Sequence, residues 1–223
     1  MNKKIIFILV AIVILIISAF FIKTYYKSSD YGNNISSKSE EEIEKYILNI
    51  ESYEAIAEIK IDSNKNTNIY TVKQQYIKKD NLYKQEVVEP ETIQGLSFTY
   101  DGKTLKIENK KLNTVKTYEN YPYIADNNLG LNSFIQDYAC SNESKYYEKE
   151  NMVILETKIK NGNKYNFAKK LYIDKENNKI AKLEIQDITQ KNLVYILYNE
   201  IKINSLQKED ILAFSLKSIN SDI

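Results

Sequence analysis

Residues 69–88 read IYTVKQQYIKKDNLYKQEVV, and this stretch decides the fold class. Tyr70, Val72 and Tyr76 fall on one face of an extended strand, because side chains alternate across a strand with a period of two. The polar run Lys-Lys-Asp-Asn at 78–81 predicts a turn, and apolar residues return at 82–88. The stretch is therefore a predicted β-hairpin with one buried face.

The same alternation continues on both sides of this hairpin. It precedes the hairpin at Ala55, Ala57, Ile59 and Ile61, and it returns at 98–107, 153–173, 180–185 and 193–198. Asp101-Gly102 and Asn161-Gly162 interrupt two of these segments, and each pair predicts a tight hairpin turn. We predict a mainly β protein of the α+β class, with one antiparallel meander of about nine to eleven strands.

Two segments have the period of a helix instead. Ser39 and Glu42 form a capping box, and apolar residues follow on one face at Ile43, Tyr46, Ile47 and Ile50. A second apolar stripe runs through Leu131, Phe134, Ile135 and Tyr138. We predict two short helices, near 40–50 and 130–139. Loops are predicted at 88–96, which holds Pro90 and Gly95, and at 121–130.

The N-terminus carries an apolar run at 5–22, interrupted by nothing more polar than Ser18. As a helix these residues would extend ~27 Å, enough to cross the apolar core of a bilayer. We predict a membrane anchor at 1–27, a polar tether at 28–39 and a β domain at 40–218. The protein would cross the membrane once and hold the β domain outside the cytoplasm. The residues expected at the membrane interface are Lys3, Lys4, Lys23, Tyr25 and Tyr26. A cleaved signal peptide is the alternative, because Ile17-Ser18-Ala19 is half of a cleavage pattern.

Charge argues against a nucleic-acid partner. All 31 basic residues are lysines, and four of them lie within residues 1–27, where no acid occurs. The remainder carries 27 lysines against 30 acids, a net charge of −3, whereas nucleic-acid binding needs a concentrated basic face. The pairs Lys110-Lys111 and Lys169-Lys170 are predicted to be solvated strand ends.

The groups that most enzymes use are missing. The chain has no histidine and one cysteine, Cys140, so neither a metal-binding histidine pair nor an activated thiol is expected. Neighbouring carboxylates such as Glu148/Glu150 and Glu184/Asp187 have the chemistry for acid–base catalysis, but 30 acids produce such neighbours by chance. We predict a non-catalytic protein without metal or cofactor.

Aromatic residues are abundant, with 19 Tyr and seven Phe. Tyrosine can line a groove with its ring dry and its hydroxyl in water, or it can simply replace other aromatic residues in the core. The alternating apolar residues are predicted to lie either in the core beneath a helix or along a concave wall that binds a partner. These candidates are Tyr70, Val72, Tyr76, Leu171, Ile173, Leu183 and Ile185.

Three strings carry a resemblance to a known superfamily: the 69–88 hairpin, FTYDGKTLKIENKKLNTVKTY at 98–118 and LYIDKENNKIAKLEI at 171–185. Over about residues 40–215, the chain resembles the LolA/LolB-type lipoprotein carriers, and most of all the GerS-type germination lipoproteins of clostridial spore formers. The resemblance implies a curved half-barrel with two short helices. It departs from the family at the anchor, because no cysteine follows the apolar run to accept a lipid.

The GerS-type resemblance implies a non-catalytic partner of a CwlD-type cell-wall amidase, placed in or near the intermembrane space of the forespore. The wider superfamily implies the alternative, a carrier or sensor that holds a lipid or a lipoprotein acyl chain in a concave groove. A mainly apolar concave face would favour the carrier. A filled face with an exposed edge or loop would favour a protein partner.

Overall fold

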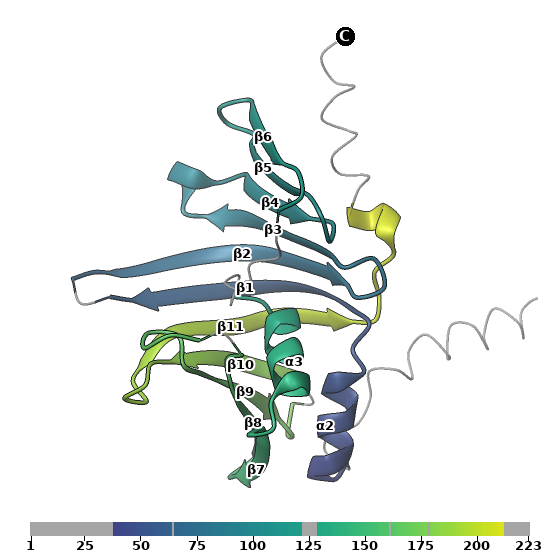
Figure 1. Ribbon diagram of the computed structural model, residues 1–223, viewed down its shortest axis with the longest axis vertical. Coiled ribbons are helices and arrows are strands. Elements are labelled where there is room, and N and C mark those ends of the chain that lie inside the picture. Colours follow the sequence, from purple (N-terminus) through teal and green to yellow (C-terminus); the bar gives the residue numbers. More distant parts are fainter. Residues whose placement is uncertain (1–37, 64, 122–128, 161, 178, 212–223) are drawn as a thin grey trace, which may run out of the picture. The chain divides into compact units, whose positions relative to one another are not determined.

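A computed structural model describes residues 38–63, 65–121, 129–160, 162–177 and 179–211, all within the compact unit that begins at Ile35. They form an open antiparallel sheet of 11 strands, two α-helices whose full bounds are described, and a helical segment at 208–211 where the described part ends (Figure 1). The helices are α2 (Glu40–Leu48) and α3 (Leu131–Cys140), and a short 3-10 turn, η3 (Glu91–Ile93), follows the third strand. The strands are β1 (Ser52–Asp62), β2 (Thr67–Ile77), β3 (Leu82–Glu89), β4 (Leu96–Tyr100), β5 (Leu105–Asn109), β6 (Thr114–Tyr118), β7 (Lys145–Lys149), β8 (Met152–Lys158), β9 (Ala168–Asp174), β10 (Lys179–Gln186) and β11 (Asn192–Ile203).

The pairing of β1 with β11 joins the beginning of the domain to its end. Tyr53 lies opposite Ile203, and Ile61 lies opposite Val194. The strand order is β6-β5-β4-β3-β2-β1-β11-β10-β9-β8-β7. The expected number of strands is confirmed, but the expectation of one meander is wrong, because two meanders meet at β1 and β11. The chain therefore passes from one edge strand, β6, through α3 to the other edge strand, β7.

The hairpin at 69–88 is confirmed as β2 and β3, and its turn relies on Asn81, which has a φ of +46°. The other two hairpins pair as expected, but their turns are not two-residue turns. At 101–104 only Gly102 has a positive φ, and the Asp101 carboxylate accepts hydrogen bonds from the main chain of Lys103 and Thr104. A nine-residue loop separates β8 from β9. Strand β7 was not predicted.

The sheet is curved, and irregular pairing accompanies the curvature. The register shifts between Ile56 and Ala57 on β1, between Thr71 and Val72 on β2, and twice on β10. Each bulge bends its strand and increases the local twist. An inner face, on which α2 and α3 lie, is thereby distinguished from an outer face.

Both helices confirm the sequence pattern. Ser39 caps α2 in the predicted capping box, and Ile43 and Ile47 of α2 are fully buried. All four residues of the predicted stripe on α3 are buried as well. The main strand contacts of the helices are with β7 and β8. Figure 1 draws α2 and α3 at the β7–β11 end of the sheet, away from β4–β6.

The predicted membrane anchor lies outside the described residues, as do Lys3, Lys4, Lys23, Tyr25 and Tyr26. Within the described part of the chain, no helix has both the length and the apolar character to cross a membrane.

Candidate partner-binding surface

The seven candidate residues all lie on the inner face of the sheet, where six of them belong to the hydrophobic core. Tyr70 is the exception, since it is only half-buried. The other six residues are at most 5% exposed, so they belong to the core that the sheet shares with the helices rather than to an open wall. The buried six are Val72, Tyr76, Leu171, Ile173, Leu183 and Ile185.

The inner face at the β4–β6 end is apolar but less covered. Phe98 on β4 pairs with Ile107 on β5, and Tyr100 pairs with Leu105. Leu96, Phe98, Leu105 and Ile107 are all half-buried, whereas their counterparts on β8–β10 are fully buried. We call these four residues the apolar shelf.

Strand β6 forms the free edge beside this shelf. Its residues from Thr114 to Thr117 are exposed, and Val115 keeps 57% of its surface in contact with solvent. Leu112, in the turn that precedes β6, is 69% exposed. An edge strand presents unpaired main-chain N–H and C=O groups, so it can accept another strand.

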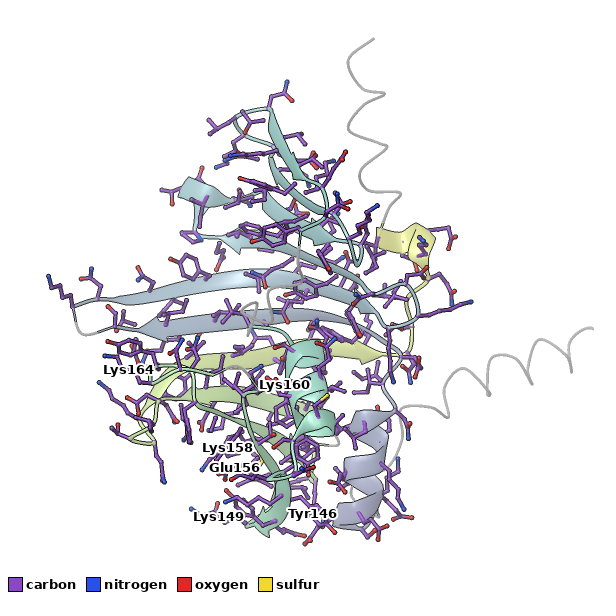
Figure 2. All side chains as sticks on the ribbon, in the orientation of Figure 1. Tyr146, Lys149, Glu156, Lys158, Lys160 and Lys164 are labelled. Atoms are coloured by element: carbon purple, nitrogen blue, oxygen red, sulfur yellow. The ribbon has the colours of Figure 1, made fainter. Side chains whose placement is uncertain are left out.

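The opposite edge, β7, is better protected. Its sequence, KYYEK, carries three charges in five residues, and α2 packs against it. Tyr146 and Lys149 lie at this end of the sheet (Figure 2). Charged side chains and a covering helix are common means of preventing edge-to-edge pairing. Of the two edges, β6 is therefore the more available.

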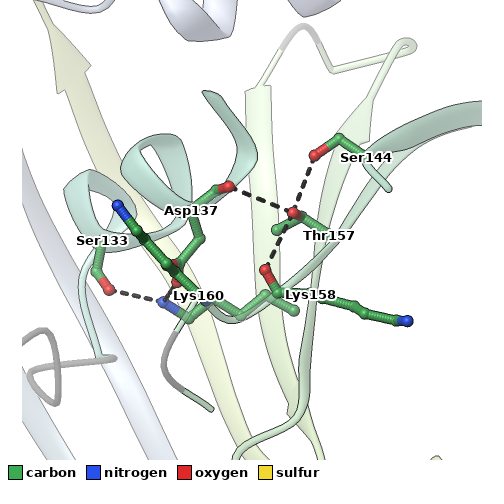
Figure 3. A network of polar contacts seen from close by, with 7 residues as sticks. Ser133, Asp137, Ser144, Thr157, Lys158 and Lys160 are labelled. Carbon is green, nitrogen blue, oxygen red and sulfur yellow. Dashed lines mark hydrogen bonds and ion pairs between the residues drawn. The ribbon is translucent and has the colours of Figure 1, made fainter. Parts of the chain in front are cut away.

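A buried ion pair fixes α3 on the sheet. The ammonium of Lys169 is fully buried on β9 and lies 2.7 Å from the Asp137 carboxylate and 2.6 Å from the Ser133 hydroxyl. Figure 3 shows Ser133 and Asp137 on α3. Burial lowers the pKa of the Lys169 ammonium, while Asp137 acts to raise it. The prediction that Lys169 is a solvated strand end is wrong. Because the pair is enclosed between α3 and the sheet, its position suits a structural role.

A second buried polar group anchors the start of α3. The Tyr53 hydroxyl donates to Asn132 at 3.0 Å, and the Gln74 amide donates to the carbonyl of Leu129 at 2.6 Å. A Cβ atom at Gly130 would lie 2.3 Å from the Asn132 side-chain oxygen, so only glycine fits there without a shift. These contacts specify where α3 begins.

Three of the four carboxylates considered for catalysis, all except Glu150, are already engaged in structural contacts. Glu184 is buried and accepts hydrogen bonds from Tyr172 and Lys182. Asp187 accepts from the main chain of Thr189 and Lys191 within its own turn, and Glu148 pairs with Lys175. Among the described residues, no group of three or more His, Cys, Asp or Glu residues is placed to hold a metal ion.

No protein-family model matches the chain, and no curated protein matches it. Solved structures that are similar include an uncharacterized conserved protein from Thermus thermophilus, at 12% identity and a TM-score of 0.49, covering 78% of this chain and 92% of that one. The structure of the CwlD amidase from Clostridioides difficile in complex with the GerS lipoprotein matches at 25% identity and a TM-score of 0.42, covering 77% of this chain and 96% of that one. A LolA superfamily protein from Nitrosomonas europaea matches at 12% identity and a TM-score of 0.43, covering 79% and 97%. These similar structures thus include a LolA superfamily protein and a complex that contains the GerS lipoprotein.

Proposed function

We propose that this protein is a non-catalytic, membrane-anchored binding protein that docks a protein partner outside the cytoplasm through strand β6. The observation that carries this proposal is a difference between the two ends of the inner face. Its helix-covered end is filled by packed side chains, while the other end terminates in the exposed edge strand β6, which carries Val115 and follows the exposed Leu112.

The chemistry of β6 suits pairing with a partner strand. Its sequence, TVKTY, contains three β-branched residues and no proline, so the strand can extend a ladder. Main-chain hydrogen bonds would supply affinity, and side chains such as Val115 would supply selectivity. Lys116 points to the inner face opposite Ile107 and is the single charge on the strand.

The class of partner comes from the sequence resemblance. GerS-type proteins imply a CwlD-type amidase, in which case the hydrolytic chemistry belongs to the partner. The structural contacts of Glu148, Glu184 and Asp187 and the lack of histidine in the chain agree with this division of roles.

A carrier function is the second candidate, and the apolar shelf is the observation that favours it. Leu96, Phe98, Leu105 and Ile107 form a half-buried apolar surface along which an acyl chain could lie. A carrier would use the shelf itself, whereas a protein-docking role would use the strand edge.

The test compares two edge variants of the full-length protein in nanodiscs. Val115→Lys on β6 should weaken binding of a CwlD-type amidase from the same organism by about 30-fold, the loss of one interface hot spot. Tyr146→Lys makes a similar change on β7 and should leave the affinity within about twofold. Biolayer interferometry measures both.

Three results would count against the proposal: no complex with the wild type, equal losses in both variants, or a loss of thermal stability in Val115→Lys. A fluorescent fatty acid tests the carrier alternative. If it binds the wild type and Phe98→Ala abolishes binding while Val115→Lys does not, the carrier reading replaces the docking reading.

A further inference from the structure

The outer face of the sheet neutralises most of its own charges. Carboxylates on neighbouring strands each lie within ion-pair distance of a lysine, so little net field remains over them. These pairs are Glu54–Lys73 at 2.9 Å, Glu86–Lys110 at 2.7 Å, Glu108–Lys106 at 3.0 Å, Glu156–Lys170 at 3.3 Å and Glu184–Lys182 at 2.6 Å.

One groove on this face departs from that pattern. It lies where β1, β2 and β3 meet η3 and has a volume of about 550 Å³. Glu58, Glu89 and Glu91 line it, and no lysine of the described residues forms an ion pair with any of the three. Thr71 donates a hydrogen bond to Glu89 at 2.9 Å, and Lys111 bonds to Glu91 only through its main-chain oxygen.

The same groove exposes apolar surface. Ile69, on its wall, is 53% exposed, and Val88 and Pro90 also line it. An exposed isoleucine beside carboxylates that form no ion pair is unusual on a face where most other carboxylates are matched by a lysine. A side chain with a long aliphatic stem that ends in a positive charge complements both the apolar surface and the carboxylates.

A metal ion fits this groove poorly. Among the described residues, no three carboxylates come close enough together to ligate a cation. A lysine or arginine side chain is longer, so its stem can pack on Ile69 while its charged end reaches Glu58 or Glu89.

We propose that the groove formed by Glu58, Ile69, Glu89 and Glu91 binds a protein segment that carries lysine or arginine side chains. The groove lies on β1–β3 and η3, whereas the proposed docking edge is β6. The two sites can therefore be tested separately. Val115→Lys should not change the affinity of the groove for a basic segment, and removal of the groove charges should not change the affinity of β6 for the amidase.

The test uses a fluorescein-labelled Lys-Val-Lys-Val-Lys peptide and the full-length protein in zwitterionic micelles, with fluorescence anisotropy as the readout. The variant E58Q/E89Q/E91Q should raise the Kd of the peptide about tenfold, because three facing charges are lost. The matched control E54Q/E86Q/E108Q removes the same number of charges from the same face and should change the Kd less than about twofold. Ile69→Ser should raise the Kd about threefold through the lost apolar contact.

Four results would overturn the proposal: no binding of the peptide by the wild type, equal losses in both triple variants, equal binding of a Glu-Val-Glu-Val-Glu peptide, or displacement of the peptide by micromolar calcium. Thermal melting of each variant checks that the sheet is intact. If E58Q/E89Q/E91Q does not fold, Ile69→Ser and the acidic peptide still distinguish binding in the groove from non-specific electrostatic attraction of the peptide.

Discussion

The two ends of the sheet carry similar apolar alternation, but they bury it to different extents. At the β8–β11 end, Leu171, Leu183 and Ile196 are inaccessible beneath the helices. At the β4–β6 end, Phe98 and Ile107 occupy equivalent inner-face positions and are only half-buried. Burial of apolar surface is the main source of folding free energy, so the covered end should hold the fold together and the uncovered end should be free to bind.

The largest expected effect is at the buried ion pair of the covered end. Asp137→Ala leaves the Lys169 ammonium buried without its partner, and removing one member of such a pair costs about 3–5 kcal/mol. Urea unfolding followed by circular dichroism measures the loss. The double variant Asp137→Leu/Lys169→Met, which removes both charges, should recover most of it. A loss below about 1 kcal/mol in Asp137→Ala would mean that the pair is not enclosed.

The second prediction compares one isoleucine from each end. Ile185→Ala, in the core, should lower the free energy of unfolding by about 2–5 kcal/mol, because it leaves a cavity. Ile107→Ala, on the apolar shelf, should cost about 1 kcal/mol, because part of its surface is already in water. Tyr76→Ala should resemble Ile185→Ala, and the half-buried Tyr70→Ala should be milder. Equal losses at Ile185 and Ile107 would contradict the contrast between the ends.

Substitution of Tyr198, on β11, should have a smaller effect, and it should stabilise the protein rather than destabilise it. Its hydroxyl is buried and has no hydrogen-bond partner among the described residues, so Tyr198→Phe should stabilise the protein by about 1 kcal/mol. Burial also raises the pKa of the Tyr198 phenol well above its usual value. The unfolded chain therefore ionises first, and stability is lost as the pH rises above about 10. Tyr198→Phe should flatten this alkaline loss in urea unfolding at pH 8 to 11, and an unchanged slope would contradict it.

Local features of the fold could be predicted from the sequence. The capping box at Ser39, the alternation in 69–88 and the stripe from Leu131 to Tyr138 depend on residues a few positions apart, and all three are confirmed. The pairing of β1 with β11 joins segments about 140 residues apart, and no local pattern specifies it. Strand β7 was missed because KYYEK does not alternate between apolar and polar residues.

The candidate site shows the same limit. The alternation of apolar residues indicated that the strand face carrying Tyr76 and Ile185 would be buried. It could not tell whether a helix of the same chain or a partner covers that face. Lys169 looked like a solvated lysine because its ion pair depends on Asp137, which is far away in the sequence. The signal that could have found it is its position in phase with Leu171 and Ile173 on the buried face of β9.

The last prediction concerns the cover of the β7 edge, where the expected effects are no larger than the effect at Tyr198. The Ser39 hydroxyl accepts a hydrogen bond from the main chain of Glu42, and Glu42 accepts one from the main chain of Ser39 at 2.8 Å. Ser39→Ala removes the first of these bonds and should cost about 1 kcal/mol, whereas Ser39→Gly should cost only a few tenths. Because α2 packs against β7, weakening the cap should speed amide hydrogen exchange at Tyr146 and Tyr147. Exchange along β6, which has no such cover, should stay the same. If both edges change together, α2 supports the whole sheet rather than the β7 edge, and the contrast between a covered and an open end would not hold at the strand edges.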